Sequence, residues 1–460
     1  MSGEWQDRLF FLKYRLYRGR VGGRYKELLR SQYAGRDELE ELNWGKRREL
    51  LKSSYEKVPY YREKYQKVGL EPGDIKKREE WERMPVLKKD EIRDHFRELL
   101  ARDGEKRFLI ESTTGGSTGE PLKVLFDKRI PQEAYGWRMM KWWGIEPGGD
   151  AAYVWRRRRE NWGRRKINEM LWWPTRRMEL DASCMTEEKM RDFVGRFNRI
   201  GPALLQGYVG AIDHLASYIE DEQLKIQPPK AIWVTSSPVS SVQRKRIERI
   251  FEAPVYDQYG CGEMFWLAAQ CGERGGLHIN YEGRYIEFVE ENGRGCEEGQ
   301  YGRILITDLD NRLFPLIRYE NGDRGRSLAG QCGCGVTLPM MGQVRGRMTE
   351  MIRLPDRSCI SGDYLTTIFD AYPEVVKSFQ VRQEADYSIR LLYVPQGKGA
   401  ELQRVMGKVN EEVVKRTREQ VPVRLEEVEE IPHREGKLLY VSSAIGQDKE
   451  KKSEALISKS

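Results

Sequence analysis

Glu111-Ser-Thr-Thr-Gly-Gly-Ser-Thr-Gly-Glu-Pro-Leu-Lys123 is the stretch of sequence that decides the predicted fold. Its residues 112–119 hold three glycines and five hydroxyl side chains, and the apolar residues 108–110 and 122–126 on either side predict a strand, a loop and a second strand. Glycines let backbone N–H groups converge on an anion because no Cβ blocks the approach, and hydroxyls donate hydrogen bonds to phosphate oxygens. By composition alone, a phosphate-binding loop and a plain polar hairpin connection fit equally well. A Walker A loop is excluded, because no Gly-Lys-Ser or Gly-Lys-Thr closes the stretch.

The composition describes a highly charged chain with enough apolar residues for a sizeable core. The 460 residues predict two or more domains, and 39% of them are hydrophobic. The net charge of +8 suits anionic cofactors or an anionic membrane and does not by itself imply nucleic acid. There is no run of 18 apolar residues and no signal peptide pattern at the start, so we expect no transmembrane helix. Seven cysteines, an odd number, favour a reducing compartment, and we therefore expect a cytoplasmic protein.

Residues 5–18 predict a basic amphipathic helix at the N-terminus. Apolar residues recur there at helical spacing with basic residues between them: Trp5, Leu9, Leu12 and Leu16 alternate with Arg8, Lys13, Arg15 and Arg18. Such a helix binds a membrane surface or packs on its own domain, and both interpretations stay open. Residues 35–105 predict short helices, the first of which ends near Asn43.

The middle of the chain predicts a mostly parallel sheet. Residues 231–235 and 255–259 are buried-type strands, and a helix at 240–251 separates them. Polar clusters follow both strands, Ser236-Ser237-Pro238 after the first and Gly260-Cys-Gly-Glu263 after the second. Ligands bind at the carboxyl ends of such strands, so we expect a binding site there.

The pattern changes after residue 283. Short strands at 285–289, 302–307 and 314–319, separated by Asn and Gly turns, predict an antiparallel, barrel-like sheet. A smaller α+β unit follows, with strands near 376–382, 387–394 and 437–442 and a helix at 399–419.

Five motifs follow one another along residues 45–445. They are Thr113-Thr-Gly-Gly-Ser-Thr-Gly119, Tyr259-Gly-Cys-Gly-Glu263, Gly302-Arg-Ile-Leu-Ile-Thr-Asp-Leu309 with Pro315-Leu-Ile-Arg-Tyr-Glu-Asn-Gly-Asp323, Arg345-Gly-Arg347 and Pro432-His-Arg-Glu-Gly-Lys437. In this order they resemble the motifs of the adenylate-forming enzymes, in particular the phenylacetate–CoA ligase branch and its CapK-type proteins, which include coenzyme F390 synthetase. The stretch from 302 to 323 is the most specific match.

The resemblance implies an α/β fold with two domains. The large N-terminal adenylate-forming domain would hold mostly parallel sheets flanked by helices and a small β-barrel-like part, and a smaller, mobile α+β domain would rotate between two half-reactions. We expect an N-terminal segment at 1–44, a large ATP- and substrate-binding domain at 45–347, a small domain with the catalytic lysine at 348–446 and a disordered tail at 447–460.

The activity implied by the resemblance is ATP-dependent activation of a carboxylic acid as an acyl-adenylate, followed by transfer to CoA. The implied catalytic residues are Lys437, Glu263 and Arg347, with Glu263 as a Mg²⁺ ligand because hard oxygen suits that ion. Asp323 would accept hydrogen bonds from the ribose hydroxyls. The other implied ATP-binding residues are the phosphate loop and those around the adenine: Ser112, Thr113, Thr114, Gly115, Gly116, Ser117, Thr118, Gly119, Ser236, Ser237, Tyr259 and Gly260.

Two other functions remain open. The first is adenylyl transfer to a hydroxyl, or ligation of the activated acid to an amine such as an amino sugar. The second is a non-catalytic nucleotide-binding or membrane-surface scaffold. The basic residues 156–166 fit a solvated loop better than a nucleic-acid surface, so no nucleic-acid partner is expected. The resemblance also implies a homodimer, and the sequence does not name the acid.

Cys271, His278, Cys332 and Cys334 supply three thiols and one imidazole in glycine-rich turns. Three thiolates and a histidine can hold Zn²⁺ in a closed tetrahedral site. The spacings Cys-x₆-His and Cys-x-Cys are looser than paired Cys-x₂-Cys motifs, so four unrelated side chains are the alternative. The resemblance favours structural zinc, because some relatives carry metal here.

Overall fold

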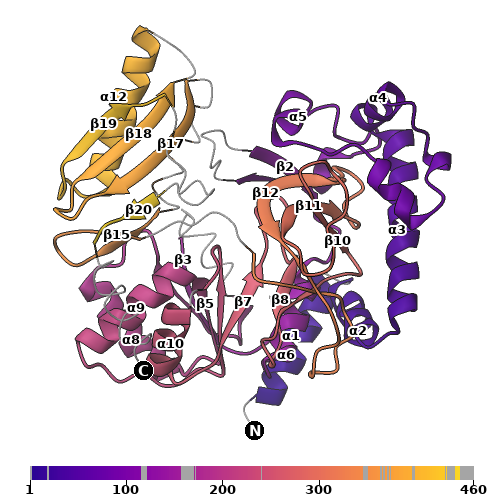
Figure 1. Cartoon of the computed structure of the whole chain (residues 1–460). Helices are drawn as coiled ribbons and strands as arrows, with labels where there is room; N and C mark the ends of the chain where they lie inside the picture. Colours follow the sequence, from indigo (N-terminus) through magenta and orange to yellow (C-terminus); the bar gives the residue numbers. More distant parts are fainter. Residues whose placement is uncertain are drawn as a thin grey trace. The chain divides into compact units, whose positions relative to one another are not determined.

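The computed structural model describes residues 3–17, 20–114, 122–156, 170, 172–239, 241–344, 351–362, 365, 368–369, 372, 375–395, 399–429, 431 and 441–445 (Figure 1). The chain divides into two compact units. The first comprises Met1–Thr114, Leu122–Gly148 and Tyr256–Gly346, and the second comprises Gly115–Pro121, Gly149–Val255 and Arg347–Ser460. Each unit is therefore built from segments that lie far apart in the sequence.

Most helices of the first unit come from the N-terminal third of the chain. The helix that we expected to end near Asn43 continues to Lys57, because buried Leu50 and Leu51 prolong its apolar stripe. The next helix starts with Pro59, whose fixed φ suits the first helical position. The α-helices are α1 (Gly3–Tyr17), α2 (Val21–Ser31), α3 (Arg36–Lys57), α4 (Pro59–Lys67), α5 (Lys89–Asp94) and α6 (Glu133–Trp142), and the 3₁₀ turns are η1 (Pro72–Asp74), η2 (Arg78–Arg83) and η3 (Lys106–Phe108).

The strands of the first unit form three groups. Two strands pair as an antiparallel hairpin with Thr114 opposite Leu122, which confirms the strands predicted on either side of the glycine-rich loop. The other groups have the orders β10-β11-β12 and β7-β8-β9-β14-β13. The strands are β1 (Leu109–Thr114), β2 (Leu122–Asp127), β7 (Val255–Tyr259), β8 (Ala268–Gln270), β9 (Leu277–Ile279), β10 (Arg284–Val289), β11 (Gly302–Asp308), β12 (Tyr319–Gly325), β13 (Ser327–Leu328) and β14 (Met340–Met341).

The antiparallel part differs from the sequence-based expectation in two ways. Residues 314–319 are not a strand, since β12 begins only at Tyr319. Pro315 has no N–H to donate to a ladder, and Tyr61 Oη instead donates to Pro315 O (2.9 Å) and accepts from Ile317 N (3.0 Å). Within the described residues no pairing closes β10 onto β12, so the part expected to be barrel-like is an open sheet of three strands, too few to close.

Buried ion pairs brace the core of the first unit. The side chains of Arg138 and Glu282 are both 0% exposed and paired, and Arg284 Nη1 lies 2.6 Å from Asp308 Oδ1. Burial opposes the charge of Glu282, but Arg138 holds the pKa of that carboxyl below its ordinary value. Removing one partner would leave a buried charge uncompensated. Arg138–Glu282 therefore holds α6 against the β9–β10 segment, and Arg284–Asp308 joins β10 to β11.

The second unit contains a parallel sheet in the order β4-β3-β5-β6, which confirms the mostly parallel sheet expected in the middle of the chain, with 231–235 as one of its strands. Helices lie beside these strands in Figure 1. Thr186 begins one helix by accepting a hydrogen bond from Lys189 N, and Gly201 ends it with φ 61°, in the left-handed region. The elements are β3 (Ala151–Trp155), β4 (Arg177–Asp181), α8 (Glu187–Ile200), β5 (Leu204–Tyr208), α9 (Val209–Asp221), β6 (Ala231–Thr235) and α10 (Ser241–Phe251).

The C-terminal part of the second unit is α+β, as predicted. A sheet in the order β19-β18-β17-β20 is accompanied by one long helix, whose buried face includes Val405, Val409 and Val413 (Figure 1). The sequence missed β19, whose residues alternate charged and apolar on an exposed edge. The elements are β15 (Met351–Arg353), β16 (Cys359–Ser361), β17 (Val376–Gln383), β18 (Ile389–Pro395), α12 (Ala400–Arg416), β19 (Val423–Glu427) and β20 (Val441–Ser443).

A glycine allows β5 to approach β3. A Cβ on Gly207 would lie 2.5 Å from Val154 O and 3.0 Å from Val154 Cβ. We expect Gly207→Ala to lower the free energy of unfolding by about 1–3 kcal/mol, because neither strand can move away without breaking the ladder. Gly195→Ala on α8 is the control, since its Cβ meets nothing within 4 Å and alanine favours a helix. Urea unfolding measures both, and equal stability of Gly207→Ala and the unchanged chain would contradict this packing.

Candidate active site

Tyr259, Asn321 and Asp323 form a hydrogen-bonded cluster in the first unit. Tyr259 ends β7 and donates from its hydroxyl to Asp323 Oδ2 (2.9 Å). Asn321 Nδ2 donates to both, at 2.7 Å to Tyr259 Oη and 2.6 Å to Asp323 Oδ2. Burial raises the pKa of Tyr259 well above its ordinary value, and the neighbouring Asp323 raises it further, so the phenol remains a donor. The half-buried Asp323 carboxylate is thus fixed in position by two neutral groups.

Glu263 lies four residues after Tyr259 and is 6% exposed. Tyr319, the first residue of β12, is fully buried and donates from its hydroxyl to Glu263 Oε1 at 2.8 Å. Among the described residues Glu263 forms no ion pair, although a buried carboxylate is costly without a cation. Burial and the nearby Glu263 raise the pKa of the Cys261 thiol well above its ordinary value, and this neutral thiol hydrogen-bonds to Glu263 as well. The site therefore presents a carboxylate with neutral hydrogen-bond partners, whose charge a bound cation could neutralise.

The turn between Tyr259 and Glu263 leaves little room for a side chain at Gly260. A Cβ on Gly260 would lie 2.8 Å from Gln258 Nε2 and 3.3 Å from Trp266 N. Ser112 Oγ lies 3.5 Å from Gly262 O, which is at the limit of a hydrogen bond. The strand that enters the glycine-rich loop therefore lies beside the turn that carries Glu263.

Arg318 holds the backbone in position directly before Tyr319. This fully buried residue has φ 49°, in the left-handed region that non-glycine residues rarely adopt. Its guanidinium pairs with Glu287 at 3.1 Å and donates to Glu82 O, and its backbone N–H donates to Thr307 Oγ1 (2.9 Å). Charge-assisted bonds of this kind hold the backbone in an otherwise unfavourable conformation just before the site.

The structure brings together part of the residue set predicted from the sequence. Ser112, Tyr259, Gly260, Glu263 and Asp323 lie in the first unit and are linked by the contacts above. Ser236 and Ser237 follow β6 in the second unit, where Ser236 has φ 83°. The predicted residues Gly115, Gly116, Ser117, Thr118, Gly119, Arg347 and Lys437 lie outside the described residues, as do the side chains of Thr113 and Thr114.

Sequence reasoning missed Asn321, Tyr319 and Arg318. All three lie inside the stretch from Pro315 to Asp323 that was the most specific motif, so the signal was present. Their roles depend on long-range contacts that the sequence does not show: Asn321 and Tyr319 contact residues of β7 and its turn, 56 to 62 positions earlier in the sequence.

The predicted cysteine–histidine cluster assembles in the first unit. One ligand atom from each of Cys271, His278, Cys332 and Cys334 lies within 4.8 Å of the others. Cys271 Sγ is 3.5 Å from Cys332 Sγ, and Cys334 Sγ is 3.4 Å from His278 Nε2. The Nδ1 atom of His278 lies 3.2 Å from Leu338 O, an arrangement that orients the ring with Nε2 toward the thiols.

Burial shapes the chemistry of this cluster. It raises the pKa of the Cys334 thiol to about 12 and also raises the pKa of Cys271, while it lowers the pKa of His278. The thiols of Cys271 and Cys334 are therefore protonated at neutral pH unless a positive charge binds among them. Three soft sulfur donors and a neutral imidazole at these distances are a donor set suited to Zn²⁺.

No family model matches the chain. Curated relatives do: it is 25% identical over 359 residues to a phenylacetate–coenzyme A ligase of Thermus thermophilus, covering 75% of this chain and 78% of that protein. It is 24% identical over 347 residues to the corresponding ligase of Escherichia coli, covering 69% and 72%. It is also 25% identical over 253 residues to protein CapK of Staphylococcus aureus, covering 52% of each.

Solved structures of a CoA ligase superpose on most of the chain. A 2-hydroxyisobutyryl-CoA ligase in complex with 2-HIB-AMP and CoA superposes with a TM-score of 0.64 at 19% identity, covering 92% of this chain and 94% of that one. The same ligase in its postadenylation state gives a TM-score of 0.57 over 90% and 91%. The chain has the α/β fold of this ligase. The resemblance of its motifs to phenylacetate–CoA ligases and CapK is thereby confirmed.

Proposed function

We propose that the protein is an AMP-forming acid–CoA ligase, which activates a carboxylic acid with ATP and transfers the acyl group to CoA. The observation that carries this proposal is the pair of carboxylates, Asp323 and Glu263, held by the hydroxyls of Tyr259 and Tyr319. Relatives named phenylacetate–CoA ligase, and the structure of a ligase with an acyl-adenylate and CoA, support an acid, ATP and CoA as substrates.

In the first half-reaction, a carboxylate oxygen of the acid bonds to the α-phosphorus of ATP while the bond to pyrophosphate breaks. Asp323 would accept hydrogen bonds from the ribose hydroxyls, for which its fixed, half-buried carboxylate is suited. Tyr259 would lie against the adenine, and the loop 112–119 would surround the phosphates with N–H and hydroxyl donors. Arg347 would reach ribose or phosphate, and Lys437 would bring positive charge to the forming acyl–phosphate bond.

Glu263 is the residue that would hold Mg²⁺. Its buried carboxylate forms no ion pair with any described residue, and hard oxygen ligands are those that Mg²⁺ prefers. The ion would supply charge neutralisation at the phosphates. Tyr319 keeps the carboxylate oriented through Oε1.

In the second half-reaction, the CoA sulfur attacks the acyl carbonyl carbon, the bond to the AMP oxygen breaks, and AMP leaves. We propose that the C-terminal part from 348 to 446 moves between the two steps, with Arg347 at the hinge. This domain assignment, the tail at 447–460, a cytoplasmic location and a homodimer stay predictions.

The proposal predicts acid-dependent release of pyrophosphate from Mg·ATP, followed by a thioester when CoA is present. A panel of aromatic and aliphatic acids identifies the substrate. We expect Lys437→Ala to lower the adenylation rate at least 100-fold, because it removes charge stabilisation that operates in the transition state. Lys408→Ala on α12 is a matched control and should leave the rate unchanged.

Three outcomes separate the alternatives. Pyrophosphate release with a thioester product supports the ligase. Pyrophosphate release in which only an amine or hydroxyl acceptor gives product moves the second step to amide formation or adenylyl transfer. Binding of ATP with no turnover of any acid would contradict the proposed activity and favour a scaffold.

We also propose that Cys271, His278, Cys332 and Cys334 hold a structural Zn²⁺. Four candidate ligand atoms lie within 4.8 Å of one another, and a closed set of four ligands would leave no position for substrate. The ion would deprotonate the three thiols and join the segment after β8, β9 itself and the loop at 332–334.

This site predicts one zinc per chain, measured by elemental analysis of the purified protein. Removal with a chelator should lower the thermal unfolding midpoint by about 3–6 °C, because ligand binding at 100 times Kd is worth about 2.7 kcal/mol and the entropy of unfolding grows with chain length. Cys332→Ser should lose zinc, whereas Cys296→Ser, outside the cluster, should retain it. Zinc-free protein with an unchanged midpoint would contradict the assignment.

We propose further that α1 contacts anionic membranes through residues 5–18. Its inner face packs through Phe10, 3% exposed and 5.4 Å from Trp137 between ring centroids. Its outer face exposes three large apolar side chains at helical spacing, together with Arg8 and Arg15: Trp5 is 51%, Leu12 53% and Leu16 82% exposed. Among the described residues no helix is long and apolar enough to cross a membrane, so contact would be in the plane of the interface.

Co-sedimentation with vesicles tests this contact. We expect binding to vesicles that contain phosphatidylserine, weaker binding at high salt, and little binding to vesicles of phosphatidylcholine alone. The double variant Leu12→Ser, Leu16→Ser should lose most of this binding. Val68→Ser removes a similarly exposed apolar side chain (54% exposed) outside α1 and should bind like the unchanged protein. Equal binding by both variants would rule out α1.

A further inference from the structure

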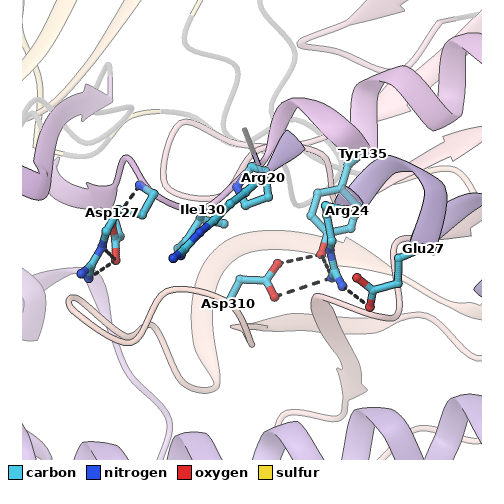
Figure 2. Close-up of a pocket in the computed structure, with 9 residues that line it drawn as sticks. Arg20, Arg24, Glu27, Asp127, Ile130, Tyr135 and Asp310 are labelled. Atoms are coloured by element: carbon cyan, nitrogen blue, oxygen red, sulfur yellow. Dashed lines mark hydrogen bonds and ion pairs between the residues drawn. The ribbon is translucent and has the colours of Figure 1, made fainter. Parts of the chain in front are cut away.

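A polar pocket of about 450 Å³ lies in the first unit, apart from the residues placed at the nucleotide (Figure 2). It is formed by the start of α2, the turn after β2, the start of α6 and the loop after β11. Three arginines line it, Arg20, Arg24 and Arg129, together with the hydroxyl-bearing Tyr135 and the carboxylate of Asp310. None of these residues has a role in the proposed adenylation.

One arginine of this pocket is held in place by neighbouring groups. Arg24 Nη2 donates to Tyr135 Oη (2.8 Å) and lies 3.7 Å from Asp310 Oδ1, and its Nη1 pairs with Glu27 at 2.7 Å (Figure 2). Only 13% of its side chain is exposed. A guanidinium fixed in this way loses little entropy when it binds a ligand, so this wall of the pocket is preorganised.

One arginine at the pocket has no acidic partner among the described residues. Its carboxylates have partners: Asp127 is bound by Arg129, Glu27 by Arg24, and Asp310 by Lys46 at 3.2 Å and Arg284 at 3.7 Å. Asp308 is bound by Arg284 as well. Four carboxylates are thus matched by four cations, and Arg20, exposed at the pocket, has no hydrogen-bond or ion-pair partner from its side chain among the described residues. The pocket therefore suits an anion with several oxygen acceptors.

The pocket connects to the active-site turn through β2. Asp127 is the last residue of β2, and the glycine-rich loop precedes the other end of this strand, six residues or roughly 20 Å away. The ring of Phe126, next to Asp127, stacks on Phe265 with centroids 5.0 Å apart, and Phe265 is two residues beyond Glu263. A ligand with an anionic group in the pocket and a long arm could reach the reacting atoms.

We propose that this pocket binds the 3′-phosphate of CoA. The inference rests on the proposed function, in which CoA is the acceptor. CoA carries a phosphate monoester and a pyrophosphate at one end and its reactive thiol at the end of a long flexible arm. The phosphate would lie between Arg20 and the fixed guanidinium of Arg24, because the arginine fork matches the geometry of phosphate oxygens. The proposal makes Arg20 and Arg24 recognition residues with no part in the chemistry.

Calorimetric titration of CoA and dephospho-CoA into the full chain tests the site without knowledge of the acid. We expect CoA to bind about tenfold more tightly than dephospho-CoA. Dephospho-CoA lacks the phosphate, and the loss of one charge-assisted hydrogen bond raises Kd about tenfold. Arg20→Ala should reduce this ratio to near one by weakening CoA alone. Arg30→Ala removes an exposed arginine of α2 that does not line the pocket and should keep the ratio.

Steady-state kinetics separates this inference from the proposed function. In the thioester assay, Arg20→Ala should raise KM for CoA about tenfold with kcat unchanged and leave KM for dephospho-CoA as it was. Thioester formation in which Arg20→Ala has the same KM for CoA as the unchanged chain would overturn the phosphate site and leave the ligase intact. A CoA-to-dephospho-CoA ratio near one in the unchanged chain would overturn it too. Absence of thioester from every acid would contradict the ligase, while the titration would still decide the site.

Discussion

Two buried tyrosine hydroxyls position the two carboxylates on which the candidate active site depends. Tyr259 reaches from β7 to Asp323 on β12, and Tyr319 reaches from β12 back to Glu263 after β7. The two donations run in opposite directions between the same two segments, so neither segment can shift without losing both bonds. A neutral donor costs less to bury than a cation and leaves the carboxylate its negative charge, which a nucleotide site with a metal ion requires.

The rest of the first unit holds these segments in register. Arg318 has a left-handed backbone conformation just before Tyr319, and its bonds to Glu287 and to the carbonyl of Glu82 compensate for it. Elsewhere in this unit, buried carboxylates such as Glu282 and Asp308 are paired with arginine. Glu263 is different, because it forms no ion pair with any described residue and its partner Tyr319 is neutral. That contrast between structural and functional carboxylates is a physical reason for placing a cation at Glu263.

Hydrophobic periodicity and the order of the motifs predicted several elements of the fold and several residues of the candidate site from the sequence. The strands around the glycine-rich loop, the parallel strands of the second unit and the C-terminal α+β part follow from hydrophobic periodicity, and the motifs gave Tyr259, Glu263 and Asp323. Long-range features could not be predicted. Asn321 has a role in the site because its side chain donates to Tyr259, which is 62 positions earlier. The pocket at Arg20 likewise combines segments more than 100 residues apart. The strand expected at 314–319 was wrong because apolar content cannot reveal that Tyr61 takes the backbone bonds around Pro315.

The most direct measurement is a calorimetric titration of AMP into the protein and into Asp323→Asn, which preserves the shape of the side chain but removes its charge. We predict at least tenfold weaker binding by Asp323→Asn, because a charged acceptor to two ribose hydroxyls is replaced by a neutral amide. Arg324→Ala, a change at the adjacent exposed residue of β12, should bind AMP like the unchanged protein. Equal affinity of Asp323→Asn and the unchanged protein, with the fold intact, would contradict the assignment of this cluster as the nucleotide site.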